Sequence, residues 1–328
     1  RDRVHLRGSR YTISSNPTFE LRQKFDTFLE DFQEGVDALK IRCPLVFQIG
    51  IADYVKNSAV TLFNGMVYQE KIGGYRFDVP SYQTLRRDMQ KLAQASVDLF
   101  YSILYSRPKP ASIAYGSIAA DAGTLNKSVD YLIHEYESRR LSSRHITRPE
   151  AAHPIAISAA VFKYIISNRI QPEVIVGLPS GSTELALAYG SIQKILSIRQ
   201  SKVVMFPVSL HSIKRDFDNM STDPENLSKF ITRHRKDFRK KEVLVVDDNT
   251  STGSTLSMVV SAIQSASPKA IDIAVAEADI IRSEIRLSCF EKSAIASRVV
   301  YKHSISVLPV SRKIAPKFDI KEIIERRK

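Results

Sequence analysis

Short apolar runs alternate with helical patterns through the second half of the chain, and this alternation constrains the fold more than any other feature. Four runs have the length and composition of buried strands. The expected strands are 172–179, 202–210, 240–248 and 270–278, with helices at 155–170, 182–196 and 255–266 and a closing segment at 297–311. Such βαβ units form a mainly parallel sheet covered by helices on both faces. In these sheets ligands bind beyond the carboxyl ends of the strands.

The first 150 residues follow a different pattern. Apolar residues at helical spacing predict helices at 17–39 and 82–105, and the prolines at 108 and 110 end the second one. Between them, 45–55 and 59–80 resemble short strands joined by turns. We therefore predict a mixed α+β region of unknown role at residues 1–150 and an α/β domain at residues 151–328, with the boundary near 145–154.

Composition excludes several classes of protein. The chain of 328 residues is 43% hydrophobic and 25% charged, as in ordinary globular proteins. No apolar run approaches the roughly 18 residues of a membrane span, and no signal-peptide pattern is present. Cys43 and Cys289, the two cysteines, lie far apart, which argues for a reducing compartment and against a disulfide framework or a zinc site. We expect a cytoplasmic protein with no membrane partner, and a homo-oligomer is left open.

The net charge of +13 comes from 48 Lys and Arg against 35 Asp and Glu. This balance favours anionic partners, whether nucleic acid, nucleotides or phosphorylated sugars. Charge alone does not decide among them.

The segment Val243–Leu256 has the most specific pattern: four apolar residues, two aspartates and a run of small polar residues around Gly253. It is not a Walker A loop, because no lysine follows the glycine, nor a dinucleotide fingerprint, which needs three glycines. A receiver domain also begins with an apolar strand and paired acids. That fold needs four more strand–helix units of roughly 30 residues each, and too little chain follows Asp247.

The residue types suit a sugar phosphate. A loop that enters a helix N-terminus offers backbone N–H groups to a phosphate, and Gly253 allows close approach of the backbone. Hydroxyls of Ser251, Thr252 and Thr255 add donors. Asp247 and Asp248 can accept hydrogen bonds from ribose hydroxyls and stabilise positive charge at the anomeric carbon. The competing interpretation is a Ser/Thr-rich turn that caps the next helix.

This segment resembles the phosphoribosyl-pyrophosphate (PRPP) signature of the type I phosphoribosyltransferases. The resemblance covers roughly residues 155–310 and implies that family's parallel sheet flanked by helices. It implies a 5′-phosphate loop formed by Asn249, Thr250, Ser251, Thr252, Gly253, Ser254 and Thr255. Asn249 departs from the family, which usually has a small apolar residue there. The acceptor-binding segment matches none of the orotate, hypoxanthine, adenine or uracil enzymes.

The resemblance implies two further elements. A loop after the first core strand binds pyrophosphate, and here it would comprise Pro179, Ser180, Gly181 and Ser182. A mobile basic hood is expected in the interval 211–241, where nine Lys and Arg face five acids. Lys214 and Arg215 follow the strand most closely and are the candidates to neutralise the departing pyrophosphate. A solvated basic loop is the competing interpretation, and the segment 229–241 could equally bind nucleic acid.

These features predict an Mg²⁺-dependent glycosyltransferase that acts on PRPP or a related nucleotide. Mg²⁺ would be bound mainly by the substrate, with Asp247 or Asp248 as protein ligands. The alternative is a non-catalytic sensor of PRPP or nucleotides on a nucleic-acid-binding regulator. Phosphoribosyltransferase-like domains also occur as effectors of bacterial conflict and antiviral systems, so a retron-like defence effector belongs to the same alternative.

Overall fold

The computed structural model divides into two units, each with its own helices and its own core. Contacts within the chain separate Arg1–Glu150 with Lys313–Lys328 from Ala151–Arg312. The residues described are 30, 33–37, 44–72, 80–106, 111–118, 171–178, 182–206, 224–250 and 254–278. The helix expected at 155–170 and the segment 297–311 lie outside them. No helix within these ranges is both long and apolar enough to cross a membrane.

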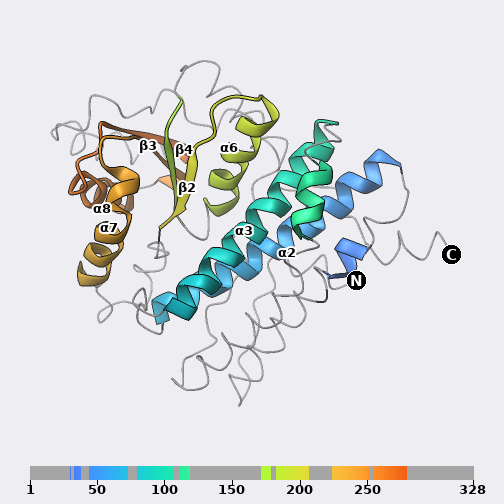
Figure 1. The fold of residues 1–328 in the computed structure, drawn as a ribbon, viewed down its shortest axis with the longest axis horizontal. Helices are drawn as coiled ribbons and strands as arrows, with labels where there is room; N and C mark the ends of the chain where they lie inside the picture. Colours follow the sequence, from blue (N-terminus) through green and yellow to red (C-terminus); the bar gives the residue numbers. More distant parts are fainter. Residues whose placement is uncertain are drawn as a thin grey trace, which may run out of the picture. The chain divides into compact units, whose positions relative to one another are not determined.

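The first unit contains two long helices that lie side by side, α2 (Leu45–Ile72) and α3 (Pro80–Leu104) (Figure 1). Helix α3 confirms the helix predicted at 82–105. Residues 33–37 and 111–118 are also helical. The strands predicted at 45–55 and 59–80 are wrong, because α2 occupies all of the first segment and the second as far as Ile72.

Helix α2 is hard to recognise because it is buried over much of its circumference. Val55, Ala59 and Phe63 are at most 1% exposed, and so is Lys56. The Lys56 ammonium lies 3.0 Å from the Asp53 carboxylate and 4.7 Å from the centre of the Phe100 ring of α3. A helix that is apolar nearly all round has no clear 3.6-residue alternation, so its β-branched and aromatic residues resemble strands.

The second unit contains a four-stranded parallel sheet, as the sequence predicts. Its strands are β1 (Val174–Gly177), β2 (Lys202–Met205), β3 (Glu242–Thr250) and β4 (Ala270–Ala278), in the order β2-β1-β3-β4. Strand β3, which carries the paired aspartates, is therefore an interior strand. Val174–Val176 and Val243–Val246 are at most 2% exposed, which explains their continuous apolar runs.

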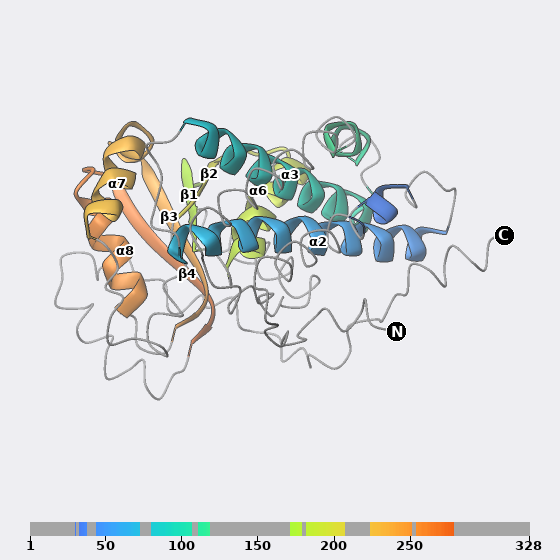
Figure 2. The ribbon, with the colours of Figure 1, turned by 90° about the horizontal axis from the view of Figure 1, so that it is seen from below.

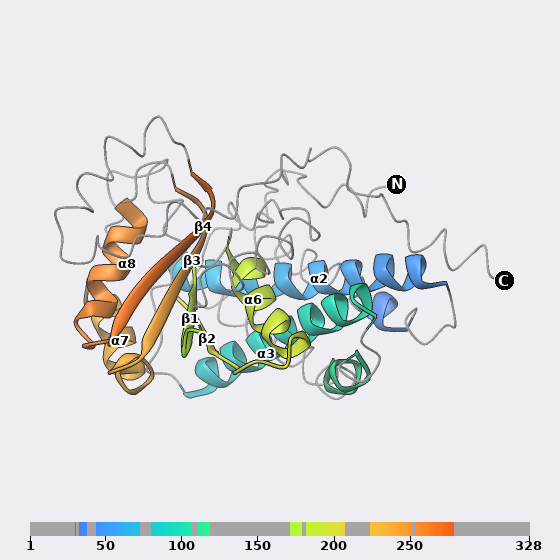
Figure 3. The ribbon, with the colours of Figure 1, turned by 90° about the horizontal axis from the view of Figure 1, so that it is seen from above.

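Helices cover both faces of this sheet. Helix α6 (Thr183–Ile195) packs against β1 and β2 on one face, and α8 (Ser254–Gln264) packs against β3 on the other (Figures 2 and 3). Helix α7 (Pro224–Phe238) lies beside α8. It occupies half of the interval 211–241, so that interval is not one continuous hood loop. The buried residues Phe230, Ile231 and Phe238 recur at helical spacing, and this is the signal in the sequence that could have identified α7.

Candidate active site

The register of the sheet brings two sequence-predicted segments together at its carboxyl edge. Strand β1 ends at Gly177, which pairs with Val246 of β3 and Met205 of β2. Strand β3 continues past this point to Thr250, paired there with β4. Asp247 is therefore the first β3 residue beyond the end of β1, next to where the chain leaves β1 for α6.

Asp247 is a buried carboxylate, with 6% of the residue exposed. It pairs with Val275 of β4, while Asn249 pairs with Glu277 and Thr250 with Ala278. A buried carboxylate at a strand end needs charged or hydrogen-bonding partners, and Asp247 makes polar interactions in this structure. Its position suits a carboxylate that accepts hydrogen bonds from hydroxyl groups or binds a cation.

The predicted 5′-phosphate loop is shorter than the sequence indicates. Asn249 and Thr250 still belong to β3, and Ser254 and Thr255 already form the first turn of α8. Ser251–Gly253 lie outside the described residues, as do the side chains of 248–250, 254 and 255. The connection between strand and helix is thus three residues long, which places the N-terminus of α8 directly beyond the end of β3.

The β1–α6 loop is closed by Ser182. The Ser182 hydroxyl donates to the Leu178 carbonyl oxygen at 2.6 Å and accepts from the Leu178 N–H at 2.7 Å. The Ser182 N–H also donates to that carbonyl at 3.3 Å. Ser182 is 0% exposed, so this hydroxyl serves the shape of the loop. Pro179, Ser180 and Gly181, the other predicted members of the pyrophosphate loop, lie outside the described residues.

Two buried polar residues at the start of α6 are not among the residues predicted from the sequence. Thr183 is 0% and Glu184 5% exposed, directly after the loop. An acid in the first turn of a helix is stabilised by the positive end of the helix dipole. Glu184 follows the small residues of this loop in the sequence, and a carboxylate at that position is the signal that could have identified it.

The centre of α6 carries a buried ionisable residue, Tyr189. Burial, together with the Asp272 carboxylate of β4, raises the pKa of Tyr189 well above its usual range. Tyr189 is 0% exposed, so it stays a neutral phenol at physiological pH. It lies on α6, about two turns away from the loop at the carboxyl edge.

Most of the basic hood lies at the wrong edge to cover a ligand. Helix α7 ends at Phe238, and the following turn leads into the amino end of β3 at Glu242. The cations from Arg235 to Lys241 therefore lie at the amino edge, opposite Asp247. Lys214 and Arg215 lie outside the described residues, and their role stays a prediction.

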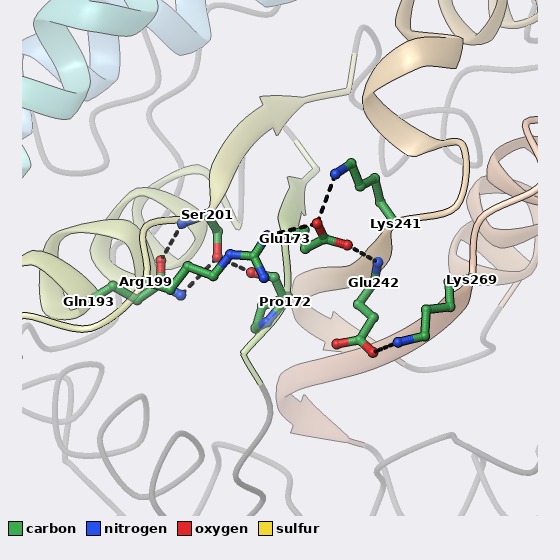
Figure 4. A network of polar contacts seen from close by, with 8 residues as sticks. All are labelled: Pro172, Glu173, Gln193, Arg199, Ser201, Lys241, Glu242 and Lys269. Atoms are coloured by element: carbon green, nitrogen blue, oxygen red, sulfur yellow. Dashed lines mark hydrogen bonds and ion pairs between the residues drawn. The ribbon is translucent and has the colours of Figure 1, made fainter.

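The amino edge is closed by its own polar network (Figure 4). Glu173 accepts from Arg199 and from Lys241 at 2.8 Å each, and from the Glu242 N–H at 3.3 Å. The Lys241 hydrogen bond, more than any other contact, holds the pKa of Glu173 below its usual value. Lys269 pairs with Glu242 at 2.7 Å. This network joins the starts of β1 and β3.

The donor set at the carboxyl edge suits a hard cation only in part. Asp247 offers the oxygen ligand that Mg²⁺ prefers. In the ranges where side chains are described, no three His, Cys, Asp or Glu residues lie together as a metal-binding group.

A parallel sheet with helices on both faces and two strand-to-helix connections at its carboxyl edge defines an α/β domain of the doubly wound type. Comparison with family models makes the assignment specific. Residues 150–285 match the model for the phosphoribosyl transferase domain. The match covers somewhat less than half of the chain and supports a phosphoribosyltransferase-type domain of the type I family at these residues. No curated protein matches the chain.

Proposed function

We propose that the chain transfers a phosphoribosyl group from PRPP, or from a related nucleotide, to an acceptor. The observation that carries this proposal is the buried Asp247 carboxylate on an interior strand, beside the β1–α6 loop and just before the N-terminus of α8. The reaction breaks the bond between the anomeric carbon and pyrophosphate. A bond from that carbon to the acceptor forms, and the acceptor loses its proton.

The roles follow from position and chemistry. Asp247 and Asp248 accept hydrogen bonds from the ribose hydroxyls and stabilise the positive charge that develops on the ribose ring. The turn from Asn249 to Thr255 binds the 5′-phosphate, with the N–H groups of the first turn of α8 directed toward it. Residues 179–181 bind pyrophosphate, and Ser182 holds their loop in shape. Lys214 and Arg215 balance the charge of the leaving pyrophosphate.

Magnesium is part of the proposal. It would be bound mainly by pyrophosphate and ribose oxygens, with Asp247 or Asp248 as the protein ligand. When bound, it supplies positive charge that favours departure of pyrophosphate. The carboxylate at the end of β3 orients the ribose toward it.

Pyrophosphate release tests the function. We expect the full chain to release pyrophosphate when mixed with Mg²⁺, PRPP and a panel of nucleobases. The double variant Asp247→Asn/Asp248→Asn keeps the side-chain shapes and removes two charges, so the rate should fall at least a hundredfold, as for loss of electrostatic transition-state stabilisation.

Glu242→Gln is the matched control. It removes a carboxylate from the same strand at the opposite edge of the sheet, where Glu242 pairs with exposed Lys269. Its rate should stay within about twofold of the wild type, because an exposed pair contributes little. Undiminished release in the Asp247/Asp248 double variant would contradict the assigned roles.

A further inference from the structure

Helix α7 presents a continuous basic surface that the proposed transfer reaction does not use. Between Ser228 and Lys240 the exposed residues include six cations and no acid. The α7 basic face consists of these six residues: Lys229, Arg233, Arg235, Lys236, Arg239 and Lys240. Asp237, the one acid in this stretch, is directed to Lys202 and His234.

The cations are arranged by helical geometry. Lys229, Arg233 and Lys236 are spaced four and three residues apart, so they form one row along the helix, and Arg235 and Arg239 form a neighbouring row. The opposite side of α7 holds Phe230, Ile231 and Phe238, which are buried. A helix of 15 residues is about 22 Å long. Its outward side is therefore long enough to follow several phosphates of an extended anion.

Helix stability explains only part of this charge. Cations in the last turn interact favourably with the helix dipole, by about 0.3–1 kcal/mol each. That effect reaches Arg235, Lys236 and Arg239. Lys229 and Arg233 also interact within the protein. The four cations between Arg235 and Lys240 repel each other, and a polyanion relieves that repulsion.

The position of the aromatic residues of α7 indicates which kind of polyanion would bind. Phe230 packs on Phe206 at 4.9 Å and on His234 at 4.4 Å between ring centres, so these rings point into the domain. Proteins that bind single strands stack bases on exposed aromatic rings, and the α7 basic face has none. An interfacial membrane helix needs an exposed apolar face. From Ser228 to Phe238, where the side chains of α7 are described, the large apolar residues are buried.

We propose that the α7 basic face binds the phosphate backbone of a nucleic-acid duplex, without reading its sequence. Backbone contacts by Lys and Arg fix a protein on a duplex but carry no base information. The C-terminal part of this surface, Arg235 to Lys240, lies at the amino edge of the sheet, opposite Asp247.

Fluorescence anisotropy with labelled 20-base-pair DNA and RNA duplexes tests the proposal on the full chain. We expect binding that weakens on the order of a hundredfold between 50 and 200 mM salt if four phosphates are contacted. The variant Arg233→Gln/Arg235→Gln/Lys236→Gln/Arg239→Gln should bind at least tenfold more weakly. Its salt slope should fall by about one unit for each phosphate that the variant no longer binds.

The control is Arg87→Gln/Lys91→Gln/Lys194→Gln, which removes three exposed cations from α3 and α6. It lowers the net charge of +13 by three units, and the α7 variant lowers it by four. The control should bind within threefold of the wild type, and circular dichroism should show both variants folded. If the α7 variant unfolds, Arg235→Gln/Lys236→Gln replaces it, with an expected threefold or greater loss.

Four results would overturn the proposal: no duplex binding by the wild type at low salt, equal losses in the α7 variant and the control, preference for a single strand, or equally α7-dependent binding to anionic vesicles. Asp247→Asn/Asp248→Asn should bind duplex like the wild type. That arm separates failure of this surface from failure of the transfer reaction.

Discussion

Gly177 closes β1 at a point where no side chain fits. A Cβ atom there would lie 2.6 Å from the Ala186 Cβ of α6 and 2.8 Å from the Met205 Sδ of β2. The Gly177 carbonyl also accepts from the Phe206 N–H at 2.8 Å. The glycine therefore serves close packing of the strand against α6 and β2, at the base of the loop expected to bind pyrophosphate.

Replacing this glycine should destabilise the fold. Gly177→Ala forces α6 outward, and overpacking of this kind costs about 1–3 kcal/mol. Urea denaturation should show the loss as a lower midpoint. Gly116→Ala is the control, because nothing lies within 4 Å of its added Cβ and the residue is helical. That change should be neutral or stabilising. Equal midpoints for Gly177→Ala and the wild type would refute the close packing at this glycine.

Individual residues differ in how far the sequence determines their role. The paired aspartates are recognisable because charge directly after an apolar strand is unusual. Ser182 is also predicted as a site residue, but its hydroxyl bonds to the Leu178 backbone, a use that depends on how the chain turns. Sequence does not distinguish a hydroxyl that faces a ligand from one that closes its own loop.

Helix α7 is fixed to the sheet by a polar contact at its last turn. Asp237 pairs with Lys202 of β2 at 2.6 Å and with His234 Nδ1 at 2.9 Å. Burial opposes ionisation of Asp237, but the Lys202 and His234 hydrogen bonds outweigh it and leave the pKa below the ordinary 3.8. The carboxylate therefore stabilises the folded state while it is ionised.

The pH dependence of stability follows from the lowered pKa of Asp237 in the folded state. Because the folded pKa is depressed, the contribution is fully present above the unfolded pKa of about 3.9 and is lost as pH falls through the folded value. Asp237→Asn should cost about 1 kcal/mol at pH 7, and the difference from wild type should shrink below pH 4. Thermal unfolding at several pH values measures it.

Asp88→Asn on α3 is the control for this contact. Asp88 lies 3.7 Å from Lys91 in an exposed pair, so the change should have little effect at any pH. A difference between Asp237→Asn and the wild type that stays constant from pH 7 to pH 3 would rule out the ionised pair as its cause.

The strands of the second unit and its helices α6 and α8 are predicted well from the sequence, and α7 and α2 are not. Strands β1, β3 and β4 are short apolar runs bounded by polar residues, and such a run has few alternatives in a parallel sheet. Helix α2 contains Gly50 and Gly65 among β-branched and aromatic residues. Local propensity therefore favours strands, and packing against α3 overrides it.

A thermal-shift measurement of ligand binding tests the whole molecule, and it detects binding even if the protein is a sensor without turnover. PRPP with Mg²⁺ should raise the melting temperature, because a ligand at 100 times its Kd stabilises the native state by about 2.7 kcal/mol. Asp247→Asn/Asp248→Asn should abolish most of the shift, and Glu242→Gln should retain it. A shift in melting temperature without pyrophosphate release would favour the non-catalytic sensor. No shift with PRPP or with nucleotides would contradict both the transferase and the sensor.

Sequence by itself determined the parallel α/β class, the signature at the end of β3 and the basic character of 229–241. These are local properties, since strand periodicity and the spacing of acids depend on residues that are close together in the sequence. Only the tertiary structure decided that the cations from Arg235 to Lys241 lie at the edge opposite Asp247, and that α2 is one helix. Both depend on contacts between residues far apart in the chain, where burial and strand register, and not local preference, set the free energy.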